Sequence, residues 1–340
     1  MTFLRTLLNR IVVTQDNYLE TLGGTIDSTK AYFLDGVIDI GSNPINVPSE
    51  GVFISGYGRD ISKLITSQTS FTMFIGATAG NIFLRSFSIE VNGSGSQVFE
   101  VTSNTGFDAI ELNEINFDKC ASLGNINGYR QGLETNTGRF SGTPELTLSG
   151  NWLGGYFIDT SIVRSLTDGT YTLFKAGVGF TMASRFRSNQ NIDLPTNASF
   201  FDFEPDNFTN PSTLQIDSAI VSRNGVFNAS DTNITPNIDQ TNLVSSWRGN
   251  VGIENTFEGG QLTLSTESTT SLTVGNWSTL AGSWTASNLE HFDNPNEGQL
   301  RHLGNSPREY KCTVDFIIQG GANDEIGIRL RKYDNSTASF

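Results

Sequence analysis

Residues 80–102 read GNIFLRSFSIEVNGSGSQVFEVT and contain three short extended runs, at 82–84, 87–91 and 98–101. The runs are rich in aromatic and β-branched residues, which favour strands. Arg85 and a serine, Ser86, separate the first two runs, and a Gly/Ser/Asn cluster separates the second from the third. The stretch therefore predicts several short strands joined by very short turns, with no helix between them.

Similar strand-like pieces, 3–8 residues long, recur along most of the chain, for example INVPSEGVFISGYG at 45–58 and TLQIDSAIVSR at 213–223. Residues 110–117 alternate between apolar and polar side chains with one phase slip, which is expected where a strand turns a corner. Repetition at roughly 20–30 residues without helices indicates a solenoid in which each coil stacks on the last. A β-sandwich explains the pieces less well, because it predicts hairpins of similar length within about 100 residues. We therefore predict an all-β protein built on a right-handed parallel β-helix.

The composition limits the partners. The chain has 340 residues, of which 36% are hydrophobic and 16% charged, and its formal net charge is −14. An acidic surface repels phosphate backbones and anionic lipids, so nucleic-acid binding and membrane insertion are not expected. Cys120 and Cys312 are interpreted as two free, half-buried thiols.

The first residues, MTFLRTLLNRIVV, differ from the rest. Their apolar positions follow the i, i+3, i+4 spacing of one helix face. The residues of this face are Phe3, Leu4, Leu7, Leu8, Ile11 and Val12. A helix this short needs a surface to pack on, because it is marginal alone in water. That surface is its own domain, its copies in an oligomer, or a larger assembly, and in the last two cases the helix is an anchor.

The expected organisation has four parts. Residues 1–19 form the anchor helix and a linker, 20–230 the β-helix, 231–260 a connector, and 261–340 a β-sandwich of the jelly-roll kind. The last part contains a predicted hairpin with strands at 314–319 and 326–333. The chain ends after the turn-like DNSTAS without a further strand, so we expect either that the module is incomplete at residue 340 or that another chain covers its edge.

The segment from Trp284 to Phe340 resembles the C-terminal jelly-roll module of structural proteins from tailed bacteriophages. The likeness rests on LRHLG at 300–304 and NDEI at 323–326. The front segments STKAYFLDGVIDIG, INVPSEGVFISGYG and NGYRQGLETNTGRF resemble the β-helical part of phage appendage proteins. The resemblance covers most of the chain but rests on pattern, not on a catalytic motif. It implies a virion protein similar to tail fibres, tailspikes and head fibres: a homotrimer with an N-terminal attachment segment, a β-helical shaft and a distal head.

No P-loop, G-x-S-x-G, H-E-x-x-H or CxxC motif occurs. His291 and His302 are interpreted as hydrogen-bonded surface or interface residues, and no metal or cofactor is expected. Hydrolysis of a polysaccharide would need two carboxylates about 5–10 Å apart. Two clusters are candidates: one holds Glu111, Glu114 and Asp118, and the other, in FFDFEPD, holds Asp202, Glu204 and Asp206. The second cluster would line one face of a strand, with Phe201 and Phe203 on the other. Solvated strand faces are the simpler interpretation in so acidic a chain.

Glycan binding without cleavage needs aromatic platforms, for which the candidates are Trp152, Tyr156, Trp247, Trp277 and Trp284. The alternative for each is packing in a core or at a subunit contact. The expected function is that of a trimeric phage appendage in the virion, attached by its N-terminus and contributing to host attachment, with a host-surface glycan as a further partner. The alternatives are a polysaccharide-degrading tailspike, and a head fibre or internal adaptor that binds no receptor.

Overall fold

The computed structural model describes residues 9–210, 213–229, 231–237, 247–253, 259–273, 276–290, 292–296, 298–302 and 312–314. These residues form an all-β structure with almost no helix. The two helical segments among them are single 3₁₀ turns, η1 (Tyr18–Glu20) and η2 (Pro205–Asn207).

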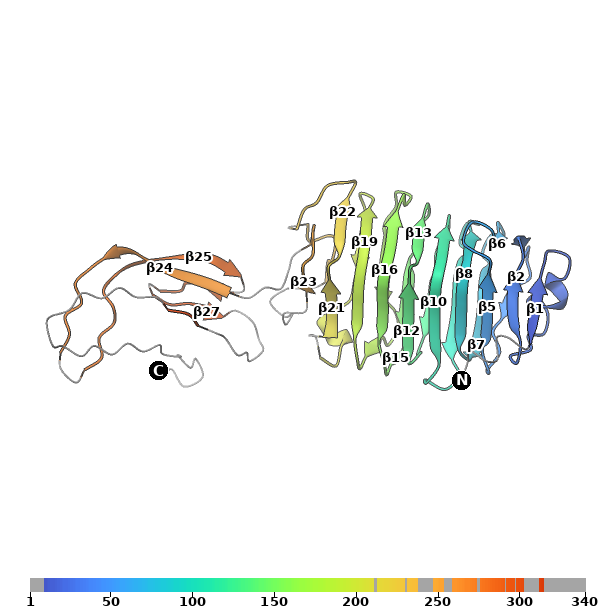
Figure 1. The fold of residues 1–340 in the computed structure, drawn as a ribbon, viewed down its shortest axis with the longest axis horizontal. Coiled ribbons are helices and arrows are strands. Elements are labelled where there is room, and N and C mark those ends of the chain that lie inside the picture. The colour runs from blue at the N-terminus through green and yellow to red at the C-terminus, as the bar shows by residue number, and fades with distance from the viewer. Residues whose placement is uncertain are drawn as a thin grey trace. The chain divides into compact units, whose positions relative to one another are not determined.

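The main body is a parallel β-solenoid of about seven turns, so the predicted β-helical fold class is confirmed (Figure 1). Its larger sheet follows a path of ten strands. They are β1 (Arg10–Val13), β2 (Ala31–Leu34), β5 (Val52–Gly56), β8 (Ile82–Val91), β10 (Ala109–Asp118), β12 (Gln131–Thr135), β16 (Tyr156–Arg164), β19 (Phe186–Leu194), β21 (Leu214–Asp217) and β23 (Trp247–Arg248). Four further strands join this sheet beside the path: β3 (Val37–Asp39), β6 (Lys63–Thr66), β13 (Gly138–Phe140) and β22 (Ile220–Arg223).

A second sheet of seven strands runs along the same coils. In chain order its strands are β4 (Ile45–Asn46), β7 (Thr72–Ala79), β9 (Gln97–Ser103), β11 (Gly124–Asn127), β14 (Leu146–Ser149), β17 (Tyr171–Ala176) and β20 (Ala198–Phe201). Two short strands, β15 (Asn151–Trp152) and β18 (Thr181–Met182), form a separate parallel pair. Each coil advances by a length close to the predicted repeat, from 21 residues between the paired Arg10 and Ala31 to 31 between Ile216 and Trp247.

The stretch at 80–102 forms β8 and β9. Within β8, the buried positions change from Ile82 and Leu84 to Phe87 and Ile89. Between them lies Ser86 at φ 57°, in the left-handed region. The serine that divides the first two runs therefore marks a bend within one strand. In β10 the same phase slip falls at Glu114, at φ 55°, so the predicted corner between residues 110 and 117 is confirmed.

The bend divides the larger sheet into two faces. The strand segments before the bend, from β1 to β23, are called the first face. The segments after the bend, together with β3, β6, β13 and β22, are called the second face. The seven-stranded sheet is called the third face. Ser86, Glu114, Asn136 and Thr160 occupy equivalent positions in successive coils, and all four have positive φ. These four successive coils therefore turn at the same point. A non-glycine residue in this region is strained by about 1–2 kcal/mol, and the strain is greatest for the β-branched Thr160.

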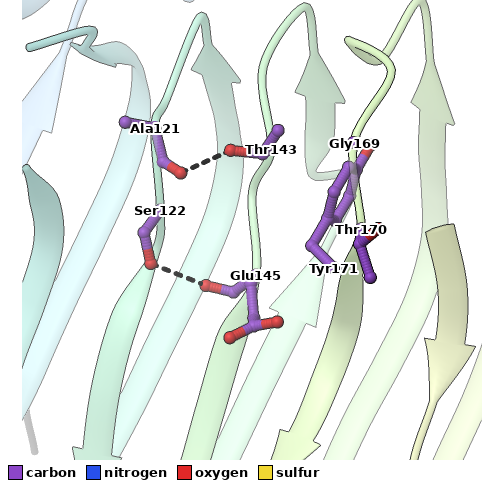
Figure 2. Close-up of a pocket in the computed structure, with 7 residues that line it drawn as sticks. All are labelled: Ala121, Ser122, Thr143, Glu145, Gly169, Thr170 and Tyr171. Atoms are coloured by element: carbon purple, nitrogen blue, oxygen red, sulfur yellow. Dashed lines mark hydrogen bonds between the residues drawn. The ribbon is translucent and has the colours of Figure 1, made fainter. Parts of the chain in front are cut away.

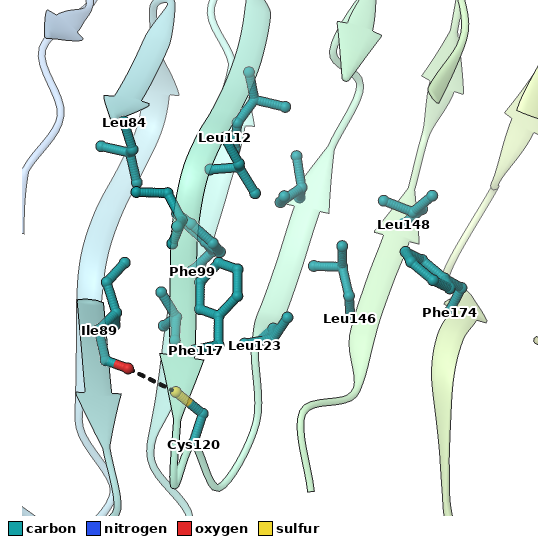
Figure 3. Close-up of a cluster of buried hydrophobic side chains, with 14 of the residues drawn as sticks. Leu84, Ile89, Phe99, Leu112, Phe117, Cys120, Leu123, Leu146, Leu148 and Phe174 are labelled. Atoms are coloured by element: carbon teal, nitrogen blue, oxygen red, sulfur yellow. Dashed lines mark hydrogen bonds between the residues drawn. The ribbon is translucent and has the colours of Figure 1, made fainter. Parts of the chain in front are cut away.

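Buried side chains from the three faces stack from coil to coil and fill the interior (Figure 3). Phenylalanine supplies much of this core, as expected from the 24 phenylalanines of the chain. Phe74 stacks on Phe99 with ring centroids 5.4 Å apart, and Phe174 meets Phe186 edge-on at the same distance. Cys120 lies in this core, and burial raises the pKa of its thiol to about 12. Cys120 and Cys312 are both free, but Cys120 is fully buried and Cys312 exposed, so neither is the half-buried thiol predicted.

Local segments close both ends of the described solenoid. At the start, the turn around η1 buries Tyr18 and Leu22 against the first coil. At the other end, the backbone N–H of Phe200 in the edge strand β20 donates to the carbonyl of Ile234, whose side chain is buried. Covering the last strand in this way satisfies backbone groups that would otherwise be free to pair with another chain.

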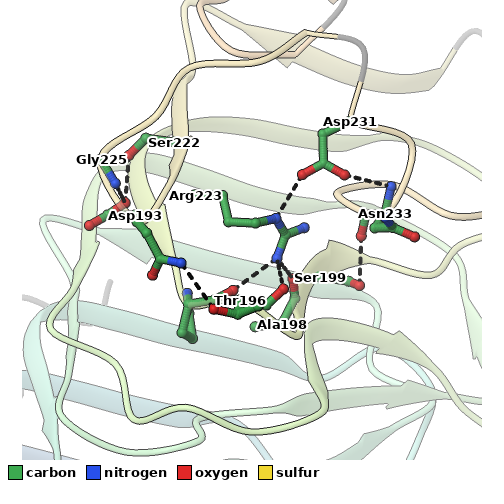
Figure 4. A network of polar contacts seen from close by, with 11 residues as sticks. Asp193, Thr196, Ala198, Ser199, Ser222, Arg223, Gly225, Asp231 and Asn233 are labelled. Carbon is green, nitrogen blue, oxygen red and sulfur yellow. Dashed lines mark hydrogen bonds and ion pairs between the residues drawn. The ribbon is translucent and has the colours of Figure 1, made fainter.

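Arg223 fixes this closing segment in place (Figure 4). Its Nε donates to Asp231 at 2.7 Å. Its Nη1 donates at 2.8 Å to each of three backbone carbonyls, those of Pro195, Thr196 and Ala198. One guanidinium therefore ties the chain after β22 to the coil beneath it.

The predicted N-terminal helix is wrong for the part of it that the structure describes, because Arg10–Val13 forms strand β1, parallel to β2. In this strand Ile11 and Val13 turn inward while Val12 is 41% exposed, so β-branched residues alternate as a strand requires. Phe3, Leu4, Leu7 and Leu8 lie outside the described residues.

After the solenoid, the described residues form two antiparallel pairs. One joins β24 (Gly259–Glu267) to β25 (Gly282–Glu290), and the other joins β26 (Phe292–Asp293) to β27 (Arg301–His302). The hairpin expected at 314–319 and 326–333 lies outside the described residues except for Val314. The jelly-roll module stays a prediction.

The bends can be tested with two matched substitutions. Thr160→Gly should raise the free energy of unfolding by about 0.5–1 kcal/mol, since the relief of left-handed strain exceeds the extra entropy that glycine loses on folding. Thr135→Gly, in a regular strand of the same region, should lower it by roughly the same amount. Urea unfolding followed by circular dichroism measures both. A loss of stability in Thr160→Gly would contradict the strain at this corner.

Candidate functional site

The first predicted carboxylate cluster is spread over the two faces that meet at the bend. Glu111 projects outward from β10 before the bend and Asp118 after it, while Glu114 stands at the bend itself. The Glu114 carboxylate accepts a hydrogen bond from the Ser86 hydroxyl of the preceding coil. Burial raises the pKa of Asp118, and Lys63 lowers it. The three carboxylates therefore do not line one face, and Glu114 has a role in the corner.

The second cluster is also only partly as predicted. Phe201 and Phe203 are buried and Asp202 is partly exposed, so the alternation holds to Glu204. The strand, however, ends at Phe201, and Pro205–Asn207 turns as η2. Proline at 205 begins this turn because its φ is already helical and no amide hydrogen is needed there. Asp206 therefore lies in the turn and does not share a strand face with Asp202 and Glu204.

Asp202 instead lies near a carboxylate that the sequence analysis did not select. It accepts a hydrogen bond from the amide of Ala176 at 2.8 Å. Burial raises the pKa of Asp202, the Ala176 amide and the Lys175 ammonium lower it, and the negative charge of Glu145 raises it. The Glu145 carboxylate accepts from the amide of Thr172 at 3.0 Å and pairs with Lys175 at 3.5 Å. Two carboxylates thus flank one lysine on the third face. Glu145 is the lone acidic residue at the head of the alternating run ELTLS, so no acidic cluster marked it as a candidate.

Glu145 also lines an open hollow of about 210 Å³ at the edge of the third face (Figure 2). Its other walls come from three successive coils, with Ser122, Thr143 and Tyr171 among the residues that face it. The Thr143 hydroxyl donates to the carbonyl of Ala121, and the Ser122 hydroxyl to that of Glu145. The hollow is polar and open, unlike the enclosed apolar pocket that holds a small organic cofactor.

A ladder of polar side chains crosses the third face between coils. Gln97 donates to Thr72 at 3.2 Å and to Glu100 at 3.0 Å, and Asn125 donates to the same Glu100 at 3.1 Å. Ser149 in the next coil donates to Asn125 at 2.7 Å. Thr72 stands beside Gln97, and Glu100 beside Asn125, because parallel pairing places equivalent outward residues of adjacent coils side by side. They offer amides, hydroxyls and a carboxylate at a repeat of about 4.8 Å.

Most of the predicted aromatic platforms are core residues. Trp152, Tyr156 and Trp247 are all at least 99% buried, so they are wrong as glycan platforms and the alternative of core packing holds. Trp152 donates its indole N–H to the carbonyl of Ser149 at 2.9 Å, which satisfies its one polar group. Beyond the solenoid, Trp277 is 56% exposed and Trp284 is partly exposed in β25. These two stay candidates.

The interior holds a charged pair that the sequence analysis missed. Glu134 and Arg139, each at least 99% buried, pair at 2.7 Å. Glu134 also accepts from the Tyr156 hydroxyl at 2.6 Å and from Thr137 at 3.1 Å. Arg139 donates to the carbonyl of Leu173 at 3.1 Å and lies over the Phe174 ring. Both charged residues point inward from the segment ETNTGR, which contains no large apolar residue and would ordinarily be assigned to the surface. No sequence pattern marked them as buried.

Breaking this pair is expected to be costly. Arg139→Met should lower the free energy of unfolding by about 3–5 kcal/mol, because it leaves the Glu134 carboxylate buried without a counter-charge. The double variant Glu134→Gln/Arg139→Met should lose less than the single variant, since no isolated charge remains. Urea unfolding of both variants and of wild type measures this, and equal losses would show that the charge pairing itself is unimportant.

The environment of Asp202 predicts a pH-dependent effect. Its pKa is raised in the folded protein, so ionisation of Asp202 weakens folding as pH rises from its unfolded-state pKa to its folded-state pKa. Asp202→Asn should therefore raise the melting temperature at pH 7 and leave it unchanged near pH 3, where the carboxyl is protonated in both states. The exposed Asp206→Asn is the matched control and should have no effect at either pH. A lower melting temperature for Asp202→Asn at pH 7 would contradict the direction.

Among the described residues, no group of three or more His, Cys, Asp or Glu side chains is placed to hold a metal ion. His302 lies in β27 with its ring 5.5 Å from that of Phe292, and His291 lies outside the described residues. The described part of the chain also contains no helix long and apolar enough to span a membrane. Comparison with protein-family models, with curated proteins and with solved structures found no match to this chain.

Proposed function

We propose that this chain is a structural protein of a bacteriophage virion, a homotrimeric appendage of the tail-fibre or tailspike type. In this proposal it attaches to the particle by its N-terminal end and contributes to attachment at the host surface. The observation that carries the proposal is the continuous parallel solenoid, whose third face presents a hydrogen-bonded polar ladder instead of an enclosed pocket.

A solenoid suits this role physically. Each coil contacts only its neighbours, so coils can be stacked into a stiff, extended body with one repeated outer surface. The ladder at Thr72, Gln97, Glu100 and Asn125 offers donors and acceptors of the kind that bind hydroxyl groups of a neutral glycan. The acidic chain disfavours phosphate-rich ligands at the same surface.

Three finer features belong to the proposal. The coils are right-handed, as parallel crossovers almost always are. The residues before β1, among them Phe3, Leu4, Leu7 and Leu8, make the attachment to the virion. The residues after the solenoid form a jelly-roll head. The likeness of residues 284–340 to phage jelly-roll modules supports the last feature.

The direct test is to locate the chain in particles. Virions purified from cells that encode the chain should contain its peptides by mass spectrometry, in a copy number divisible by three, and antibody against the chain should label an external appendage in electron micrographs. The purified chain should bind host cells in competition with the virion. Absence from purified particles would refute the proposal, whereas presence without cell binding would indicate a head fibre or adaptor.

A second candidate function, polysaccharide hydrolysis, is favoured by one observation. Asp202, whose pKa is raised by burial, and Glu145 flank Lys175 beside an open hollow. A carboxyl with a raised pKa suits a general acid, and an ionised partner suits a base or nucleophile. A hydrolase would release reducing ends from host polysaccharide, and Asp202→Asn and Glu145→Gln would each abolish the release. Binding without release supports the adhesive role.

A further inference from the structure

The first face carries a row of apolar side chains that point away from the core. Phe53, Phe83, Leu133 and Phe157 occupy one register position in their coils, with Glu111 in the same row between Phe83 and Leu133. Each is partly exposed, while its strand neighbours on both sides are buried. We call these four apolar residues the outer stripe. Outward positions of a solvated strand are ordinarily polar, and four apolar residues in one register row depart from that pattern.

More apolar surface lies toward the first coil, in the outward row next to the stripe. Phe33 is partly exposed, with Tyr57 packed edge-on at 4.4 Å and the guanidinium of Arg10 over its ring at 3.3 Å. Tyr57 is 53% exposed and Val12, in register beside Phe33, is 41% exposed. Aromatic residues and arginine together are the residues enriched in the centre of protein–protein contacts.

The charge of the first face distinguishes it from the chain as a whole. Its outward strand residues include Arg10, Arg85, Arg187 and Arg248, against Glu111, Asp159 and Asp217. Arg187 and Asp217 already pair with each other at 3.5 Å. Two copies of a chain with a net charge of −14 repel each other over most of their surfaces. On the first face the charges nearly balance, so a second copy can approach there with little penalty.

The dimensions of the face match those of a stable contact. Ten strands about 4.8 Å apart give a length of about 43 Å, and four residues at about 3.3 Å give a width of about 13 Å. The projected area is on the order of 600 Å², close to the roughly 800 Å² per partner of a standard interface. A side-chain row that repeats every 4.8 Å is complemented best by a surface with the same repeat, which another solenoid supplies.

We infer that the outer stripe is the surface through which this chain binds a second copy of itself. The inference rests on the oligomeric appendage of the proposed function and names the face that makes the contact. Burial of the stripe and of Phe33 supplies the apolar area, and the mixed charges around it set the register between the copies.

The test is sedimentation equilibrium of the full chain over a range of concentrations. Wild type should associate, and the double variant Phe83→Thr/Phe157→Thr should weaken association at least tenfold. Threonine keeps the strand propensity, and circular dichroism checks the fold. Ile75→Thr, at a partly exposed outward position on the third face, is the matched control and should associate like wild type. A monomeric wild type, or association that the double variant does not weaken, overturns the inference.

A labelling experiment keeps the inference testable if the double variant misfolds. In a Cys312→Ser background, Asn113→Cys on the first face should react with maleimide at least tenfold more slowly at high protein concentration than at low. Thr147→Cys on the third face should react at the same rate at both. If residues 1–8 of the same chain cover the stripe, protection of Asn113→Cys will be independent of concentration and lost on their deletion, which also overturns the inference. Finding the chain in virions tests the proposed function separately, because a monomer found there refutes only this interface.

Discussion

Parallel backbone pairing between successive coils is the constraint from which the rest of this structure follows. Every strand of a coil hydrogen-bonds to the equivalent strand of the next, so the coils lie about 4.8 Å apart in one register. Because side chains alternate, the register decides for each residue whether it points into the core or out to a face. Phe74 meets Phe99, and Gln97 meets Thr72, for the same reason: both pairs occupy equivalent positions in neighbouring coils.

The same constraint accounts for the corners. A coil of variable length must turn at the same place as its neighbours or the ladder breaks. Ser86, Glu114, Asn136 and Thr160 accept left-handed backbone to achieve this. Where length varies between coils, the extra residues fall between the aligned strands, so the step from Ile216 to Trp247 can exceed that from Tyr32 to Ile54 without loss of pairing. Strain at a few corner residues is offset by the hydrogen bonds and burial of whole strands.

The surfaces of the solenoid differ because each face extends one kind of outward residue over many coils. The third face carries a ladder of amides, hydroxyls and a carboxylate, and it includes the Glu145, Lys175 and Asp202 group. The first face carries the outer stripe, with charges that nearly balance. The interior holds the Glu134 and Arg139 pair, which also hydrogen-bonds to Tyr156 and to a backbone carbonyl. Adhesion on one face and self-association on another can coexist, because the faces share a core but no outward residue.

Short alternating runs, turn residues and a repeat of roughly 20–30 residues were enough to determine the all-β class and the parallel solenoid, because both depend on local pattern. The phase slip near Glu114 even located a corner. The ends and the sites depended on contacts that pattern does not contain. The pattern of Ile11 to Val13 fits a helix as well as a strand, and only its pairing with β2 decides between them. The sequence likewise allows Trp152 and Tyr156 to be surface platforms, and only the stacking of coils buries them. Glu145 and Asp202 are 57 positions apart in sequence and become neighbours only through the stacking of coils. Tertiary structure therefore decided which residues meet, since register between coils, and not spacing along the chain, sets the distance between side chains.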